Sequence, residues 1–147
     1  MLDAMKYYRL ARWLHLNKMD FLAARVQSFI FLIFNSVIPF SCEIGENTTL
    51  AYGGIAVVIH NRAKIGKNCV IGQGVTIGGR SRQYEVPVIG NNVYIATGAK
   101  VLGNVVIGDD VVIGANAVVI KSIPSHTAVA GVPARVIKTG IVMSDLV

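Results

Sequence analysis

The chain has 147 residues, of which 53% are hydrophobic and 15% are charged, enough for one domain with a dry core. Its net charge of +6 favours an anionic partner, which would be nucleic acid, a membrane surface or a phosphorylated cofactor. Because the sequence has no arginine-rich arm, zinc finger or aromatic RNA-binding motif, we expect no nucleic-acid partner. The two cysteines, Cys42 and Cys69, have neither metal-binding spacing nor a framework of pairs, which indicates a reducing compartment and no metal site.

Residues 1–40 are predicted to form a helical cap. Helix-forming residues dominate 2–16, and after a break at Asn17-Lys18 a second helix is expected from residue 19 to about residue 34. The open end of a repeat structure exposes backbone groups and core residues, and a pair of helices can cover them.

The uncharged segment 26–42 raises the question of a membrane span. It is shorter than the ~20 residues that a span requires, and polar residues interrupt it. No small-residue cleavage site follows a basic start, so a signal peptide is not indicated and we expect a cytoplasmic protein. A peripheral membrane contact through residues 1–40 is kept as an alternative, because basic and aromatic residues mix there as they do in interfacial helices.

Residues 59–119 carry an aliphatic side chain at every sixth position, with one interruption. These positions are Ile59, Ile65, Ile71, Ile77, Ile89, Ile95, Val101, Ile107, Ile113 and Val119. The period fits neither a helix nor an ordinary strand. It is typical of a parallel β-helix, in which each coil packs on its neighbours, and fifteen glycines suit tight corners with positive φ. The alternative is a sandwich of alternating strands. We assign 41–138 to the β-helix and 139–147 to a C-terminal tail, with a last short strand near its start.

Two interruptions break the six-residue period. Leu50 and Ile59 are nine positions apart, so residues 52–58 must bulge from a corner. Residues 78–87 are polar and basic and are expected to leave the β-helix as a loop. In repeat proteins such insertions often carry the binding surface.

His60 is the candidate catalytic residue, because it follows Ile59 where later repeats carry glycine. An imidazole there is not required for packing and suits a general base, although a surface hydrogen-bonding role is the alternative. His15 and His126 are expected to be structural. No Ser-His-Asp arrangement or paired carboxylates stand out, which favours direct transfer over a covalent intermediate. The Gly78-Gly79 pair could admit a ligand or donate N–H groups to an oxyanion. Candidates for phosphate contacts are the basic residues Arg80, Arg82, Lys100, Lys121, Arg135 and Lys138.

The region 42–138 resembles the left-handed β-helix acyltransferases, and within them the serine O-acetyltransferase-like branch. The resemblance rests on four segments: Val57–Ile59, Gly74–Gly79, Thr97–Asn104, and Pro124–Thr127 continuing through Gly131–Arg135. It implies a left-handed β-helix, a homotrimer, acetyl-CoA bound in clefts between subunits, and a histidine base. The expected cofactor-binding residues are Gly79, Arg80, Ala99, Lys100, Lys121, Ala130 and Arg135. The interruptions supply the candidate acceptor-binding residues Tyr52, Arg82 and Glu85, of which Glu85 is also a candidate to orient His60.

The resemblance has departures that bear on the acceptor. Serine acetyltransferases carry an Asp-His pair where this chain has roughly Ala51 to Gly53, and a second histidine where it has Val86. The chain looks more like short relatives of bacterial polysaccharide biosynthesis. We therefore expect an acetyl-CoA-dependent O-acetyltransferase that modifies a saccharide hydroxyl of a capsule, exopolysaccharide or lipopolysaccharide precursor, free or lipid-linked. A serine O-acetyltransferase and a nonenzymatic β-helix scaffold are the alternatives.

Overall fold

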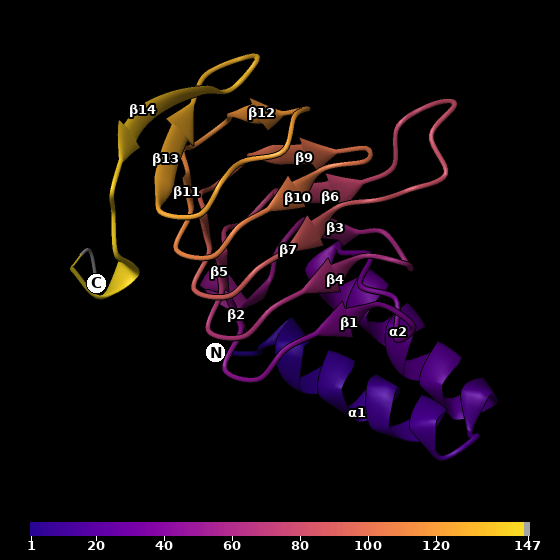
Figure 1. The fold of residues 1–147 in the computed structure, drawn as a ribbon. Helices are drawn as coiled ribbons and strands as arrows, with labels where there is room; N and C mark the ends of the chain where they lie inside the picture. The colour runs from indigo at the N-terminus through magenta and orange to yellow at the C-terminus, as the bar shows by residue number, and fades with distance from the viewer. Residues whose placement is uncertain (146–147) are drawn as a thin grey trace.

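The chain folds as a left-handed parallel β-helix of about four turns with two N-terminal helices, as predicted. In the computed structural model, which describes residues 1–145, α1 (Ala4–Leu16) and α2 (Asp20–Phe34) lie at one end of the β-helix (Figure 1). Both helices match their predicted ranges within two residues. No helix in the described part of the chain is long and apolar enough to cross a membrane.

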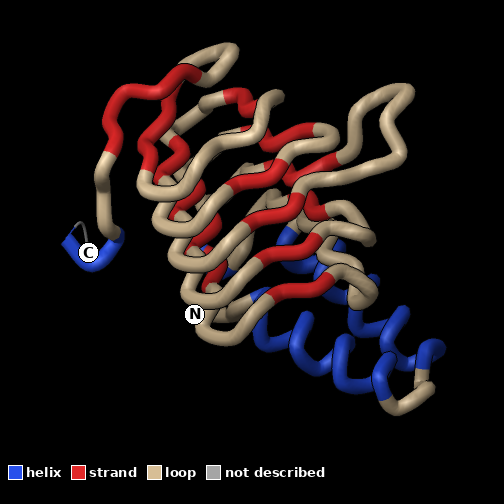
Figure 2. The backbone as a smooth tube through the Cα atoms, viewed as in Figure 1, coloured by secondary structure: helices blue, strands red, loops and turns tan. Residues whose placement is uncertain are grey.

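Short strands build the β-helix in three faces, and tan corners separate the red strands in Figure 2. Face 1 consists of β1 (Glu43–Ile44), β4 (Lys64–Ile65), β7 (Val88–Ile89) and β10 (Val106–Ile107). Face 2 consists of β2 (Thr49–Leu50), β5 (Val70–Ile71), β8 (Tyr94–Ile95), β11 (Val112–Ile113), β13 (Thr127–Ala130) and the antiparallel β14 (Arg135–Thr139). Face 3 consists of β3 (Val58–Ile59), β6 (Thr76–Gly78), β9 (Lys100–Leu102) and β12 (Val118–Val119).

The six-residue period is explained by stacked columns of buried side chains. In each two-residue strand the second residue points inward, and strands of successive coils pair in register, as Ile59 with Ile77 and Ile71 with Ile95. Each aliphatic position therefore lies directly on its equivalent in the next coil, which makes one continuous core. Cys69 is buried in this core, as the sequence suggested.

Glycine is required after the strands for a different reason from the positive φ that we predicted. A Cβ at Gly45 would lie 2.6 Å from the carbonyl group of Gly66, and one at Gly72 would lie 2.6 Å from the backbone nitrogen of Thr97. Neither glycine has positive φ, so the close approach of the next coil excludes a side chain. Positive φ occurs at other corner positions: at Gly74 and Gly98 between faces 2 and 3, as predicted for glycines, and between faces 1 and 2 at the equivalent residues Asn47, Asn68, Asn92, Asp110 and His126.

The helices cap the first coil through side-chain hydrogen bonds to its carbonyl groups. The Tyr8 hydroxyl donates to the carbonyl of Cys42 at 2.7 Å, and Arg9 donates to the carbonyls of Ile44 and Gly45. These carbonyls would otherwise form an exposed strand edge. Burial raises the pKa of the Cys42 thiol to about 12 and also raises the pKa of Tyr8.

The long loop between β6 and β7 leaves the β-helix at the corner between faces 3 and 1, as expected for residues 78–87 (Figure 1). The shorter interruption forms a 3-10 turn, Ala51–Gly53, at the corner between faces 2 and 3. After β14 the chain ends in a second 3-10 turn, Met143–Asp145. Residues 146 and 147 of the predicted tail lie outside the described residues.

Candidate active site

His60 lies at the corner between faces 3 and 1, directly below the start of the long loop. Its backbone N–H donates to the carbonyl of Ile77 at 2.8 Å, and its carbonyl accepts from Ala63 at 3.0 Å. The half-buried ring faces Gly79: a Cβ on that glycine would lie 3.7 Å from Cδ2 and 3.8 Å from Nε2 of the imidazole. The structure thus brings together the predicted histidine and the predicted glycine.

The tautomer of His60 follows from its hydrogen bond. The backbone N–H of Arg62 donates to Nδ1 of the ring at 3.1 Å. A nitrogen that accepts an N–H carries no proton, so the neutral ring holds its proton on Nε2. In this arrangement His60 presents a donor at Nε2, whereas a general base needs an unprotonated nitrogen there.

The long loop is fastened on both sides of this corner. From the coil below, Arg62 donates to the carbonyl of Tyr84, and its guanidinium lies 4.1 Å from the centre of the Tyr84 ring. From the coil above, the backbone N–H of Asn104 donates to the side-chain oxygen of Gln83 at 2.9 Å. Sequence reasoning missed Arg62 and Gln83, because neither has a position in the six-residue period that marks it.

The acceptor candidates of the loop point to solvent. Glu85 is exposed, and among the described residues the His60 ring is hydrogen-bonded to Arg62 rather than to Glu85. Arg82 is exposed with a φ of 66°. Glu85 and Arg82 both belong to the loop that begins beside Gly79, so they lie in the same region of the surface as a ligand bound at Gly79 would.

Tyr52 is not brought to His60. It lies on the opposite edge of face 3, with 64% of its surface exposed, in a hollow of about 470 Å³ that Leu2, Ile33 and Gln73 also line. At the next position, a Cβ on Gly53 would lie 2.5 Å from the carbonyl oxygen of Leu2. The N-terminal segment therefore packs directly against Gly53, while the neighbouring Tyr52 stays open to the hollow.

The cofactor candidates spread over face 3 and its ends. The Lys100 ammonium group is held on this face by a hydrogen bond to the carbonyl of Gly74. Ala134 donates its N–H to the carbonyl of Val118, which brings the turn between Ala130 and Arg135 to the last strand of face 3. Arg80, Lys121 and Arg135 are exposed and Ala130 is half-buried. Ala99 differs from the prediction: its methyl group is fully buried in the core and cannot contact a ligand.

The other histidines have structural contacts. Nδ1 of His15 lies 2.6 Å from a carboxylate oxygen of Asp20 in the turn that joins the helices. Nδ1 of His126 lies 3.1 Å from the carbonyl oxygen of Ile141, which fixes the chain after β14. Both placements agree with the structural roles expected for them.

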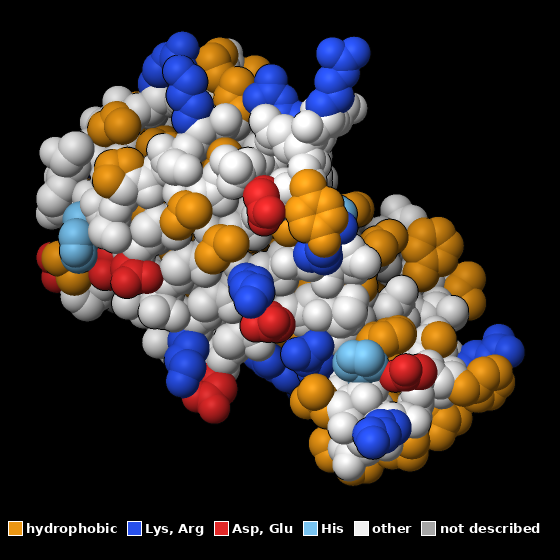
Figure 3. All heavy atoms as spheres, turned by 45° about the vertical axis from the view of Figure 1, so that its right-hand side comes forward, with side chains coloured by type: hydrophobic (Ala, Val, Ile, Leu, Met, Phe, Trp, Pro, Cys, Tyr) orange, Lys and Arg blue, Asp and Glu red, His pale blue; other side chains and the backbone are white. Residues whose placement is uncertain are grey.

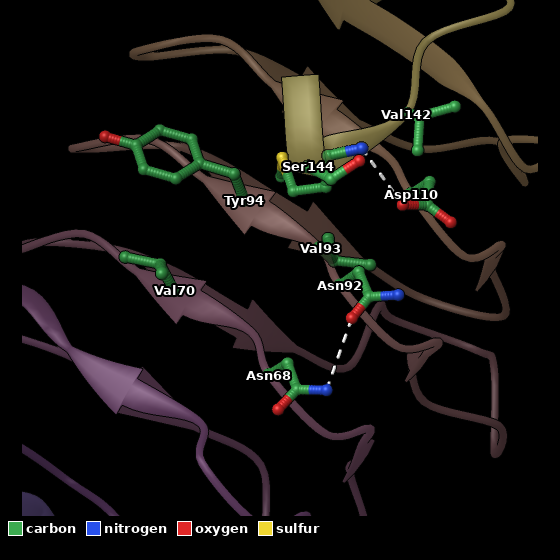
Figure 4. Close-up of a pocket in the computed structure, with 9 residues that line it drawn as sticks. Asn68, Val70, Asn92, Val93, Tyr94, Asp110, Val142 and Ser144 are labelled. Carbon is green, nitrogen blue, oxygen red and sulfur yellow. Dashed lines mark hydrogen bonds between the residues drawn. The ribbon is translucent and has the colours of Figure 1, made fainter. Parts of the chain in front are cut away.

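A hollow of about 480 Å³ lies on face 2, away from His60 (Figure 4). Asn68 donates to Asn92 at 3.3 Å along its floor, and the N–H of Met143 donates to Asp110 at 3.0 Å at its rim. None of the sequence-predicted site residues lines it. Within residues 1–145 there is no group of three or more His, Cys, Asp or Glu side chains that could hold a metal ion.

Comparisons with known proteins agree with this fold. Residues 87–121 match the family model "Bacterial transferase hexapeptide (six repeats)". The serine acetyltransferase of Staphylococcus aureus (strain Mu50 / ATCC 700699) is 42% identical over 137 residues, which cover 87% of this chain and 64% of that protein. The serine acetyltransferase of Staphylococcus epidermidis is 39% identical over 140 residues, which cover 93% and 65%.

Solved structures of serine acetyltransferases are also similar to this chain. The serine acetyltransferase of Brucella abortus strain S19 in complex with coenzyme A has a TM-score of 0.87 at 36% identity, covering 95% of this chain and 56% of that one. The enzyme from Vibrio cholerae O1 biovar El Tor N16961 has a TM-score of 0.86 at 34% identity, covering 95% and 54%.

The chain is therefore a β-helix in which residues 87–121 match the hexapeptide repeats of bacterial transferases. Along most of its length it is similar to serine acetyltransferases, although it spans just under two thirds of the length of the curated relatives that it matches. The similarity favours the serine alternative and gives no support to the polysaccharide branch that the sequence suggested.

Proposed function

We propose that this protein is an acetyl-CoA-dependent O-acetyltransferase that passes the acetyl group directly to a hydroxyl of a small acceptor. The proposal rests mainly on the 42% identity to a serine acetyltransferase over 87% of the chain. A neighbour with a TM-score of 0.87 was solved with coenzyme A, which supports the same donor here. Serine is the first acceptor to test, and a saccharide hydroxyl is the second. The cytoplasmic location predicted from the sequence belongs to the same proposal.

Face 3 is the proposed coenzyme A surface. Lys100 lies on this face, and the exposed cations Arg80 and Lys121 lie along its edge with face 1. Guanidinium and ammonium groups suit the phosphates of coenzyme A. The outward residues Val58, Val88 and Val106 are exposed on faces 3 and 1, which supports burial against further copies in a homotrimer.

In the proposed reaction the acceptor hydroxyl oxygen attacks the thioester carbonyl carbon. The new C–O ester bond forms, the C–S bond breaks, and the hydroxyl proton ends on the sulfur of the departing coenzyme A. Negative charge develops on the carbonyl oxygen, where a well-placed donor is worth about 10²–10³ in rate. His60, with its proton on Nε2, is suited to this donor role.

The general-base role predicted from the sequence is the competing assignment for His60. It requires the proton to move to Nδ1, which would break the hydrogen bond from the Arg62 N–H. Losing a general base slows a reaction by roughly 10²–10⁴-fold. The two roles therefore predict similar losses in His60→Ala and need a second variant to separate them.

His60→Gln is that variant, because a glutamine amide can donate a hydrogen bond but cannot accept the acceptor's proton at neutral pH. Thiol release from acetyl-CoA is measured with serine and with a panel of sugars. The donor role predicts that His60→Ala loses about 10²-fold and that His60→Gln stays within about tenfold of wild type. If both variants are equally inactive, the general-base role of His60 is supported instead. If His60→Ala is as active as wild type, His60 has no catalytic role. His126→Gln serves as the matched control.

A nonenzymatic scaffold is a second candidate, because this chain has Ala51, Tyr52 and Gly53 where the resemblance expects an Asp-His pair. A coenzyme A titration separates the two functions. Binding together with thiol release supports the enzyme. The scaffold is supported if neither binding nor thiol release occurs with any acceptor.

A further inference from the structure

The outer side of α2 is apolar although it faces away from the rest of the chain. Ala23, Ile30 and Phe34 are the buried residues of this helix. At 3.6 residues per turn, Phe21, Arg25 and Leu32 follow one stripe on the opposite side. Phe21 is 70% exposed and Leu32 is 76% exposed. Large exposed apolar side chains that gather on one side of a helix indicate an interaction surface.

The stripe continues onto α1 through a shallow apolar groove. Leu10 of α1 lines this groove with Arg25 and Phe29 of α2. Trp13, three residues after Leu10, lies on the same side of α1 and is also exposed. We call Leu10, Trp13, Phe21, Phe29 and Leu32 the cap face. In Figure 3 the lobe formed by the helices carries many hydrophobic side chains, with Lys and Arg side chains among them.

The charges around the cap face are mainly positive. Lys6, Lys18 and Arg25 are exposed, and the Arg25 guanidinium lies 5.0 Å from the centre of the Phe21 ring. The acidic residues of the helices are engaged: Asp3 accepts from the N–H of Met5, and Asp20 pairs with His15. A second copy placed cap face to cap face would bring like charges together, whereas an anionic bilayer would complement them.

We propose that the cap face binds the surface of anionic membranes, with the helices lying along the interface. Aromatic and aliphatic side chains enter the boundary of the acyl chains, and the cations contact lipid phosphates. This mode requires no membrane-spanning helix, in agreement with the length of α1 and α2. It stands independently of the proposed acetyltransferase function.

The test is co-sedimentation of the full chain with vesicles of phosphatidylglycerol and phosphatidylcholine, and with vesicles of phosphatidylcholine alone. Wild type is expected to sediment with the anionic vesicles and to be released at about 1 M salt, where charges are screened within about 3 Å. Phe21→Gln and Leu32→Gln are each expected to weaken binding roughly tenfold, because each removes a large apolar group from the buried set. Glutamine is a good helix former, so both variants are expected to fold.

Ile137→Gln is the matched control, because Ile137 is also apolar and 68% exposed but lies on β14, far along the chain from the helices. It is expected to bind vesicles as wild type does. The proposal is overturned if wild type does not sediment with anionic vesicles. It is also overturned if the cap variants bind normally, or if light scattering shows that they change the number of subunits without changing vesicle binding. Thiol release with a soluble acceptor in the cap variants reports separately on the enzyme.

Discussion

The substitution Gly79→Val tests whether the space in front of His60 is a site. Gly79 has no positive φ, so a side chain there causes no backbone strain. Its Cβ would lie 3.7 Å from Cδ2 and 3.8 Å from Nε2 of His60 and 3.9 Å from a methyl carbon of Val86, all ordinary contact distances. Exposed substitutions of this kind change the free energy of unfolding by about 0.5 kcal/mol or less.

The branched methyl groups of valine extend beyond Cβ and fill the space beside Nε2. A displacement of the reacting groups by about 1 Å can cost 10²-fold in rate. We therefore expect Gly79→Val to lower kcat/KM for thiol release by about 10²-fold, while the Tm stays within about 2 °C of wild type. Gly79→Ala, which adds only the Cβ, is the graded control and should lose much less. A valine variant with the kcat/KM of wild type would refute the location of the site at this corner.

Two further predictions concern the β-helix itself. Gly72→Ala should cost about 1–3 kcal/mol in the free energy of unfolding, because its Cβ would lie 2.6 Å from the Thr97 nitrogen. Gly78→Ala, whose Cβ would lie 3.4 Å from a Thr76 methyl carbon, should cost much less in the same urea titration; equal costs would contradict the close-approach explanation. Burial raises the pKa of Cys42 from 9.0 to about 12, so above pH 9 the unfolded chain loses this proton before the folded chain does. Stability should then fall between pH 9 and pH 12 by up to about 1.4 kcal/mol per pH unit, and Cys42→Ala should flatten the slope; an unchanged slope would exclude the thiol as a cause.

The period of six was sufficient to predict the coils, since it reports one inward residue per face and needs no long-range information. The loop at 78–87 was predicted for the same reason, as a place where the period stops. The contacts that hold this loop in place were not predicted, because those from Arg62 to Tyr84 and from Asn104 to Gln83 join residues more than twenty positions apart. The role of the glycines was predicted in part: Gly74 and Gly98 have the positive φ expected at corners, whereas the close approach of the next coil to Gly72 cannot be seen in one sequence.

The candidate site was predicted in part. His60 and Gly79 meet because the corners of successive coils stack, which the period implies. The state of the imidazole was not predictable, since the proton position depends on the Arg62 N–H two residues away. Tyr52 was assigned to the same site, yet the nine-residue interval places it at the other edge of face 3. Ala99 was assigned from the resemblance, and the structure shows that its side chain belongs to the core.

The proposed acetyl transfer is tested most directly by mixing the purified chain with acetyl-CoA and serine and measuring thiol release together with O-acetylserine by mass spectrometry. We expect equal amounts of thiol and acetylated acceptor, both formed at a rate that depends on His60. Acetyl transfer to a sugar and not to serine would support the proposed acetyltransferase activity with a saccharide as its acceptor. Absence of thiol release with every acceptor, in a chain that also fails to bind coenzyme A, would contradict the proposed activity.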